Sequence, residues 1–503
     1  MYIDLVMQYM INPRFILLVL FGSVIGLFVG AIPGLSVTMA TALLVSITYT
    51  WTTNDAMATI MGLYVVGVFS GALSAILINI PGAPSSVVTA FDGYPLAKRG
   101  EAYRTLKYAT IYSFIGSVFG LLALWTLCGP ISKIALKFHP IDYFLLSLFG
   151  LAAVGSLTSR TFSKGLISAT FGLFIAMIGL DSVVGSPRLT FGIRDLQAGI
   201  STVPALVGLF GFTEVLSSIG QRDMEAQVSS MKSEKVPLGE ILKHFWYSMY
   251  YAVIGTVVGA LPGAGGPVAS FLAYSSAQKV VRHPSYPFGE GAVEGIVASE
   301  TSNNACIGGA MIPMLALAVP GDAVTAIILS VFYVHGLQPG PMFIKTQPGM
   351  FAAIIAGGLL GCLFLLLLGL VVAPKLSRII LVPKRILLPL VTILCIIGAF
   401  ATNNRMFDVL LMFLFGILGY VMRRRGYPVA PMVLAIVLGG MMDSNFRRAV
   451  SLVQSEEHKI AAMFSSPITI VLLLLTIFTL VINIPFFGSR LKRGMSRSAD
   501  SAS

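Results

Sequence analysis

Long apolar stretches separated by short polar turns make up most of the chain. Residues 15–32, 109–128, 350–373 and 467–485 are free or nearly free of charge. Each stretch approaches or reaches the ~20 residues that an α-helix needs to cross the hydrocarbon of a bilayer. A helix satisfies its own backbone there, whereas a transmembrane barrel would show alternating segments of about ten residues. The pattern predicts an all-α polytopic membrane protein with roughly 10 to 14 spanning helices.

One long polar stretch near the middle divides these segments into two groups. We predict a first transmembrane repeat over residues 1–220, a polar cytoplasmic linker over 221–240, a second repeat over 241–489 and a basic, Ser-rich tail over 490–503. The apolar segments before the linker lie near residues 14–32, 36–51, 56–80, 108–128, 140–157, 165–181 and 200–219.

The two groups share a pair of Pro-Gly motifs. Gly-Ala-Ile-Pro-Gly at 30–34 returns as Gly-Ala-Leu-Pro-Gly at 259–263, and Asn-Ile-Pro-Gly at 79–82 returns as Ala-Val-Pro-Gly at 318–321. Proline removes a helix donor and glycine permits conformations closed to other residues, so each motif predicts a broken helix or a re-entrant hairpin. Interrupted segments at matching places in two halves are typical of the binding site of a secondary transporter.

The positive charges near the motifs have opposite bias in the two repeats. The turn at 50–55 has no cation, but its counterpart carries Lys279 and Arg282. Conversely, four cations lie between residues 98 and 107, whereas the stretch after residue 321 offers only Lys345. Since cationic loops tend to face the cytoplasm, the pattern predicts repeats of inverted topology.

Polar residues near the breaks are the candidate site. Broken helices expose unpaired amides and the positive end of the dipole, to which hydroxyl and amide side chains can add, so a small carboxylate is the predicted ligand. The predicted substrate-binding residues are Pro33, Gly34, Ser36, Thr38, Asn79, Pro81, Gly82, Ser85, Ser86, Thr89, Pro262, Gly263, Gly265, Gly266, Ser302, Asn303, Asn304, Pro320 and Gly321.

Two acidic residues close to these positions are the candidates for ion coupling. Glu300 precedes the Thr-Ser-Asn-Asn run, and Asp322 follows the last Pro-Gly pair. A carboxylate at membrane depth can carry a proton, and freed carbonyls suit Na+, so we expect Na+ or H+ as the coupling ion and no other cofactor. The simpler alternatives are tolerated kinks at the Pro-Gly pairs, hydroxyls that bond within the bundle, and a wet loop around Glu300.

Composition agrees with a membrane protein and argues against several other classes. The 503 residues are 56% hydrophobic and 11% charged, with a mean hydropathy of +0.88. The net charge of +12 lies in short clusters between apolar segments, which indicates topology rather than nucleic-acid binding. Four scattered cysteines are expected to be buried hydrophobes, and the five histidines show no metal spacing. The chain also lacks a zinc-protease motif or a nucleophile constellation, so we expect no enzyme and name no catalytic or metal-binding residue.

Two blocks of sequence carry a resemblance to a known family. They run from Asn79 to Pro95 and from Ala298 to Gly321. Around them the chain resembles the large membrane subunit of the tripartite tricarboxylate transporter family, the TctA-type permease. Two positions depart from that pattern, since Leu35 stands where glycine is usual and Ala83 where an acidic residue is common.

The resemblance implies a function and a set of partners. It implies a multi-pass permease of the bacterial inner membrane that takes a small tri- or dicarboxylate, such as citrate, from a periplasmic binding protein (TctC-type). It also implies a small membrane subunit (TctB-type) and a symport mechanism driven by an ion gradient without ATP. The alternatives are the permease of an ATP-driven importer, although the chain has no Walker A lysine, and a channel, which inverted repeats disfavour.

Overall fold

The computed structural model confirms the predicted all-α class. It describes residues 2–157, 162–181, 185–219, 236–373, 375, 384–454, 456 and 458–483, which leaves most of the linker and the whole tail outside the described residues. In the described part, seven helices are long and apolar enough to cross a membrane, and six shorter apolar helices accompany them. Among the described residues, the β-structure is one antiparallel pair of two-residue strands.

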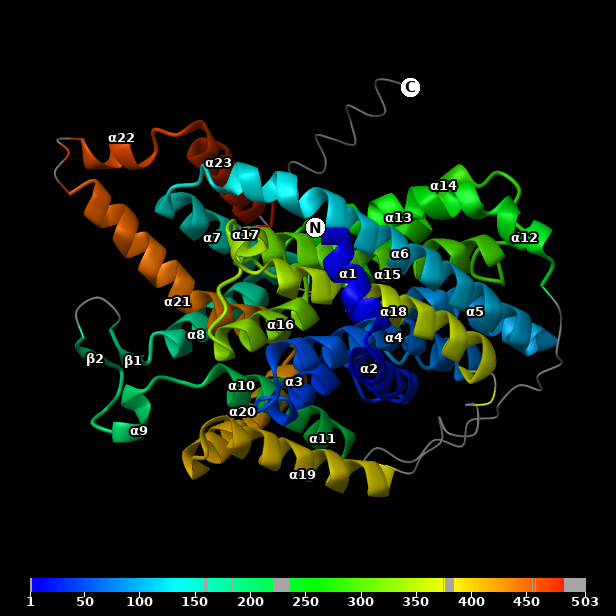
Figure 1. Cartoon of the computed structure of the whole chain (residues 1–503), viewed down its shortest axis with the longest axis horizontal. Coiled ribbons are helices and arrows are strands. Elements are labelled where there is room, and N and C mark those ends of the chain that lie inside the picture. The colour runs from blue at the N-terminus through cyan, green and yellow to red at the C-terminus, as the bar shows by residue number, and fades with distance from the viewer. Residues whose placement is uncertain are drawn as a thin grey trace. The chain divides into compact units, whose positions relative to one another are not determined.

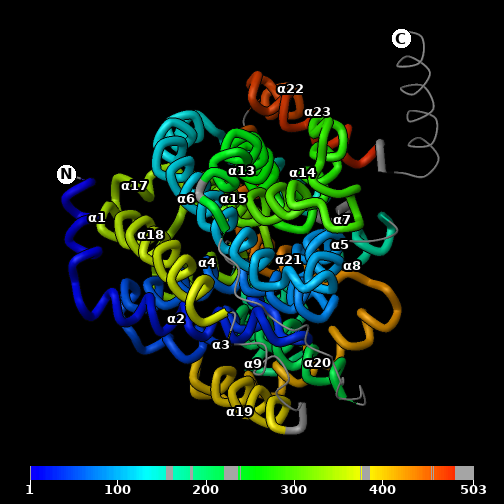
Figure 2. The backbone as a smooth tube through the Cα atoms, turned by 90° about the vertical axis from the view of Figure 1, so that its right-hand side faces the viewer, coloured from blue at the N-terminus to red at the C-terminus, as the bar shows by residue number. Residues whose placement is uncertain are grey.

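The chain forms two compact units, each built from both sides of the linker. Unit 1 contains Met1–Lys133 and Thr202–Tyr420, and unit 2 contains Ile134–Ser201 and Val421–Ser503. The predicted boundary at the linker separates two stretches of sequence and does not correspond to the boundary between these units. The two predicted repeats stay a prediction. Figures 1 and 2 show the course of the helices.

Unit 1 contains two series of helices, one around each pair of Pro-Gly motifs. The first series is α2 (Pro13–Ala31), α3 (Val37–Ile47), α4 (Thr53–Ile78), the short η1 (Pro84–Ser86) and α5 (Val87–Leu96). The second is α13 (Phe245–Ala260), α14 (Gly265–Val280), α15 (Val293–Leu317) and α16 (Ala323–Val334). All four predicted breaks therefore interrupt helices, and the second break in each series ends a helix in a left-handed residue, Asn79 (φ 57°) or Ala318 (φ 58°).

The remaining helices of unit 1 extend these series. They are α1 (Tyr2–Ile11), η2 (Ala97–Glu101), most of α6 (Ala102–Ala135), α10 (Thr202–Leu206), η3 (Val207–Phe212), α11 (Thr213–Ser218), α12 (Leu238–Lys243), α17 (Phe343–Thr346), α18 (Pro348–Val371), α19 (Lys384–Asn403) and most of α20 (Met406–Arg424).

Small residues let the first and third helices of each series approach closely. A Cβ built on Gly26 of α2 would lie 2.5 Å from the Leu63 carbonyl oxygen of α4. Aligned on the Pro-Gly pairs, these residues match Gly255 of α13 and Ser302 of α15, where the corresponding distance is 2.1 Å. The same backbone contact therefore occurs in both series, as small residues allow at helix interfaces in membranes. The predicted inversion of one series relative to the other stays a prediction.

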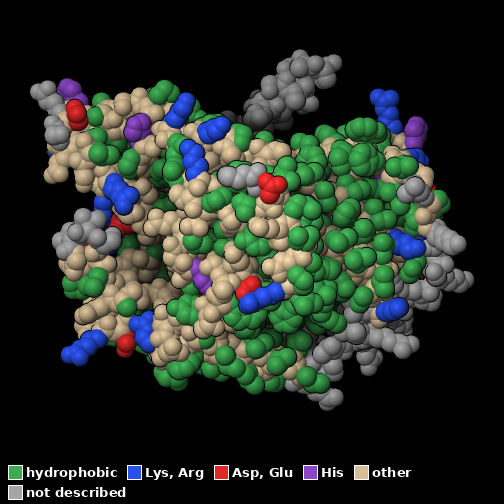
Figure 3. Space-filling view, viewed as in Figure 1, with side chains coloured by type: hydrophobic (Ala, Val, Ile, Leu, Met, Phe, Trp, Pro, Cys, Tyr) green, Lys and Arg blue, Asp and Glu red, His purple; other side chains and the backbone are tan. Residues whose placement is uncertain are grey.

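The outer face of unit 1 suits a bilayer. Figure 3 shows hydrophobic side chains covering much of the visible face over α6, α13, α14 and α18, with Lys and Arg at its edge. Val253 and Val257 of α13 and Leu363 and Leu367 of α18 are among the exposed hydrophobic side chains. In contrast, α4 and α15 are buried along nearly their whole length. All four cysteines are buried, as predicted.

Unit 2 is a smaller group of helices. It contains α7 (Pro140–Leu157), α8 (Phe162–Ala176), β1 (Gly179–Leu180), β2 (Pro187–Arg188), α9 (Arg194–Gln197), α21 (Val429–Leu452), α22 (Lys459–Met463) and α23 (Pro467–Asn483). Helix α21 packs against α7 and α8, and α23 packs against α7. Asp181, directly after β1, forms an ion pair with Arg447 of α21, and Arg188 of β2 forms one with Asp443 of α21.

Candidate substrate and ion site

A polar stretch in the middle of α15 is the centre of the candidate site. Residues 299–304 of this helix are all buried, and the helix runs through them without interruption. The polar run therefore lies within a buried helix and not in a wet loop. At the matching positions α4 carries residues 60–65, which are apolar except for Tyr64.

Glu300 is fully buried and bonded to hydroxyl groups from the first half of the chain. Its Oε1 accepts a hydrogen bond from Thr89 Oγ1 of α5 (2.5 Å), and its Oε2 accepts one from Ser113 Oγ of α6 (2.8 Å). Thr89 also lies 3.1 Å from Ser299 Oγ. Among the described residues, no Lys, Arg or His forms an ion pair with Glu300. A buried carboxyl group without a cation is costly when ionised, which suits a group that exchanges a proton or a cation.

The neighbouring polar residues of α15 differ in their bonding. Asn304 donates from Nδ2 to the Glu300 carbonyl oxygen (3.0 Å) and accepts from Ser117 Oγ of α6 (3.3 Å). Ser302 bonds to the backbone of its own helix at Ala298 (2.8 Å). The hydrogen-bonding groups of Asn304 and Ser302 are therefore used inside the protein.

Asn303 differs from these neighbours because its amide nitrogen has no partner. The residue is 2% exposed, and its Nδ2 forms no hydrogen bond with any of the described residues. Its Oδ1 lies 2.3 Å from where a Cβ on Gly266 would stand, at the first turn of α14, and Ser85 Cβ lies 3.3 Å from the same point. The structure thus brings together three predicted site residues that lie far apart in the sequence.

Asp322 has its side chain committed to two contacts. Its Oδ1 caps α16 by accepting from the Thr325 amide (2.8 Å), and Thr325 Oγ1 in turn accepts from the Asp322 amide. Its Oδ2 accepts from the Tyr64 hydroxyl of α4 (2.6 Å). Asp322 also lies beside the start of α14, with its Cβ 3.3 Å from where a Cβ on Gly265 would stand.

The other predicted site residues shape the breaks. Gly34, Gly263 and Gly265 have positive φ angles, the Gly263 amide donates to the Gly321 carbonyl (2.7 Å), and Ser36 caps α3. A Cβ on Gly82 or Gly321 would lie 2.1 or 2.3 Å from the carbonyl oxygen of Gly30 or Gly259. No hydrogen bond between described residues links the remaining positions to the α15 cluster: Pro33, Thr38, Asn79, Pro81, Ser86, Pro262 and Pro320.

Several residues of the site were missed in the sequence. Ser113 and Ser117 lie one helical turn apart in α6. A Cβ built on Gly116 or Gly120 of the same helix would lie 2.2 or 2.4 Å from the carbonyl oxygen of Thr301 or Ala305 of α15. The spacing of four between the two serines within the uncharged stretch 109–128 was the available signal. Tyr64 is the corresponding case in α4, because a tyrosine hydroxyl in a buried helix usually finds a hydrogen-bond partner.

Asp92 of α5 is a further buried carboxylate that the sequence reading did not place in the site. Its Oδ1 accepts hydrogen bonds from the amides of Gly289 (2.7 Å), Gly291 (2.9 Å) and Ala292 (2.9 Å). These amides belong to the loop that leads into α15, so Asp92 fixes that loop to the first half of the chain.

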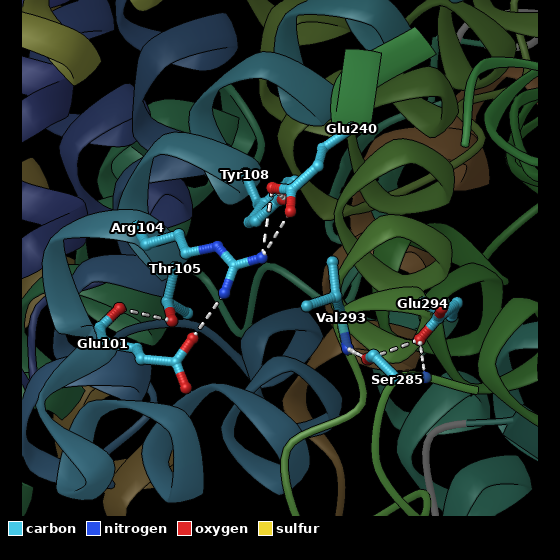
Figure 4. A network of polar contacts seen from close by, with 8 residues as sticks. All are labelled: Glu101, Arg104, Thr105, Tyr108, Glu240, Ser285, Val293 and Glu294. Atoms are coloured by element: carbon cyan, nitrogen blue, oxygen red, sulfur yellow. Dashed lines mark hydrogen bonds and ion pairs between the residues drawn. The ribbon is translucent and has the colours of Figure 1, made fainter. Parts of the chain in front are cut away.

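A polar network at the start of α6 also joins the two halves of unit 1 (Figure 4). Arg104 of α6 donates to Glu101 (2.8 Å) and to Glu240 of α12 (2.9 and 3.1 Å), and Tyr108 donates to Glu240 (2.5 Å). The Tyr108 hydrogen bond and the Arg104 guanidinium hold the pKa of Glu240 below its usual value. These contacts fix the first helix after the linker to α6.

A comparison with models of protein families identifies the kind of protein that contains this site. The model of the tripartite tricarboxylate transporter TctA family matches residues 16–434. The chain belongs to this family. As a member with many apolar helices, it is a multi-pass membrane transporter, as the resemblance in the two sequence blocks predicts.

Individual relatives agree with the family match. The chain is 34% identical over 430 residues to an uncharacterized 52.8 kDa protein of Agrobacterium vitis from the TAR-I ttuC' 3' region, which covers 85% of this chain and 86% of that protein. A second Agrobacterium vitis protein, from the TAR-II ttuC' 3' region, is 39% identical over 196 residues, 39% of this chain and 81% of that protein.

One solved structure is similar at a low level. The transmembrane domain of the cyanobacterial bicarbonate transporter BicA aligns with 94% of this chain and 98% of its own length, at 13% identity and a TM-score of 0.20.

Proposed function

We propose that this chain is the large permease subunit of a tripartite transporter that takes up a small tri- or dicarboxylate across the bacterial inner membrane. The uptake is secondary active and is driven by a gradient of Na+ or H+. A small TctB-type membrane subunit and a periplasmic TctC-type solute-binding protein complete the transporter. The family's tripartite organisation supports this assembly.

The observation that carries the proposal is the buried polar stretch of α15 beside broken helices. Helix N-termini present unpaired amides and a positive dipole end, which favour a carboxylate. Polar groups inside a membrane bundle are costly and are typical of substrate or ion pathways. In this site Asn303 supplies an unpaired donor, and Glu300 supplies a carboxyl group without a cationic partner.

Glu300 is our proposed position for ion coupling. Its hydroxyl partners can rotate to donate to a carboxylate or to accept from a protonated carboxyl group, so the site accommodates both forms. Asp322 is the second acidic candidate, but its oxygens are used by the α16 cap and by Tyr64.

The test is uptake by the complete transporter in proteoliposomes. The full chain, its small subunit and its binding protein are reconstituted, and radiolabelled citrate, succinate and benzoate are offered under imposed Na+ or proton gradients. We expect one acid to accumulate only with the binding protein present, and an ionophore to abolish the accumulation. Accumulation that survives the ionophore but needs ATP and a nucleotide-binding subunit would support the ATP-driven class. Uptake that neither saturates nor needs the binding protein would support a channel.

A further inference from the structure

The breaks form two matching places in unit 1, each beside the starts of two helices that pack against each other. Helix α3 packs against α16, and α14 packs against η1 and α5. Under the repeat, α3 matches α14, and α16 matches η1 with α5. We call the start of α3 and α16 the first place and the start of α14 and η1 the second place.

At the first place, side chains of the protein itself cap both helix starts. Ser36 caps α3 by accepting from the Met39 amide (3.0 Å), and Asp322 caps α16. The remaining oxygen of Asp322 accepts from Tyr64 of α4. Side-chain caps of this kind satisfy the amides that a helix start leaves unpaired.

The helix starts of the second place carry no such caps, and Asp322 beside the start of α14 already uses both of its oxygens. The residues before α14 and η1 are Ala264 and Ala83, and neither helix start has a side-chain cap. Ala83 matches Asp322, and Gly265 matches Ser36. Asn303 matches Tyr64, and it is the buried residue whose amide nitrogen has no partner.

From this difference we infer that the carboxylate of the transported acid binds at the second place. It accepts hydrogen bonds from Asn303 Nδ2, the Ser85 hydroxyl and the unpaired amides in the first turn of α14. The ligand carboxylate meets Asn303 as the Asp322 carboxylate meets Tyr64 at the first place. This assignment rests on the proposed function and selects one of the two places for the ligand.

Gly266 fits this assignment because a side chain would close the second place. Its Cβ would stand 2.3 Å from Asn303 Oδ1, closer than such atoms approach. The residue is also only partly buried, so the second place keeps exposed surface beside the buried amide.

The test measures binding of the acid that the wild-type transporter accumulates, chosen from citrate, succinate and benzoate, to the purified full chain. A hydrogen bond to a charged group contributes enough that Asn303→Ala and Ser85→Ala should each raise the Kd by about 10- to 100-fold. We expect Gly266→Ala to weaken binding at least as much. Gly129→Ala in α6 is the matched control, because nothing lies within 4 Å of its Cβ, and we expect its Kd to equal that of the wild type.

Thermal unfolding of each variant separates lost binding from lost folding. If Asn303→Ala does not fold, the Kd of Ser85→Ala, which removes fewer atoms, tests the assignment. Unchanged affinity in every folded variant, with wild-type uptake intact, would overturn the assignment and leave the proposed function standing. Absence of uptake by the wild-type transporter under every gradient would instead overturn the proposed function itself.

Discussion

Helices α4 and α15 occupy matching positions in unit 1 but contain different chemistry. Both are buried, both make a close backbone contact with the first helix of their series, and both are followed by a left-handed residue. Where α15 has Glu300, Asn303 and Asn304, α4 has Met61, Tyr64 and Val65. The two helices therefore share their backbone packing, but only α15 contains the polar residues of the site. The same scaffold holds an apolar core in one series and a polar cluster in the other.

A glutamate in α4 at the position that matches Glu300 should have the largest effect on stability. Met61 is fully buried, and Met61→Glu would place a carboxyl group against Gly357 and Gly358 of α18. An uncompensated buried charge costs about 3–5 kcal/mol, so we expect little folded protein. Thermal unfolding and membrane abundance measure this, with Met61→Leu as the volume-conserving control. Normal abundance of Met61→Glu would show that α4 tolerates the chemistry of α15.

Removing the charge from α15 should affect transport more than folding. Glu300→Gln keeps the shape and can still bond to Thr89 and Ser113, but it cannot exchange a proton or neutralise a cation. We expect gradient-driven accumulation to fall to the level seen without a gradient, while exchange of labelled for unlabelled acid continues. Thr126→Ala, on the exposed face of α6, is the control. Accumulation equal to the wild type would remove Glu300 from ion coupling.

Replacing the contact glycine should destabilise the packing of α4 and of α15 to a similar extent, because each helix makes the same close backbone contact. A Cβ at Gly26 or Gly255 would collide with a carbonyl oxygen of α4 or α15. We expect Gly26→Ala and Gly255→Ala each to lower the free energy of unfolding by about 1–3 kcal/mol. Thermal unfolding compares the pair with Gly129→Ala. A large loss in one variant and none in the other would contradict the matched packing.

The smallest expected effect concerns the contact between α6 and the end of the polar stretch. Ser117→Ala removes a hydrogen bond of 3.3 Å to Asn304, and Asn304 keeps its bond to the Glu300 carbonyl. We expect stability to fall by about 0.5–1 kcal/mol and uptake to stay near the wild-type rate. A strong loss of uptake at unchanged stability would place Ser117 in contact with the ligand.

The sequence predicts the helices and their breaks well, because Pro-Gly pairs and apolar length act locally. Residues 32–36 and 79–83 interrupt helices as expected, and the predicted segments 14–32 and 140–157 lie close to α2 and α7. The roles of polar residues were harder to predict, since they depend on partners distant in the sequence. Thr89 meets Glu300, and Tyr64 meets Asp322.

The contacts of the candidates depend on packing as well as on local sequence. The run at 300–304 lies well before the Pro-Gly pair at 320–321, and the packing of α14 on α15 brings Asn303 to Gly266. Thr38 and Asn79 follow or precede Pro-Gly pairs, yet no hydrogen bond between described residues connects them to α15. Proximity along the chain therefore gave candidates, and three-dimensional packing selects among them.

The buried cysteines make the native chain suitable for labelling without further changes. Cys128, Cys306, Cys362 and Cys395 are all enclosed, so water-soluble maleimides reach them poorly in the folded protein. A cysteine introduced at an exposed position near the end of α14, such as Gln278, would then be the one thiol that reacts readily. Spin labels or fluorophores at such positions can follow the movement of the two helix series during a transport cycle in an otherwise unaltered protein.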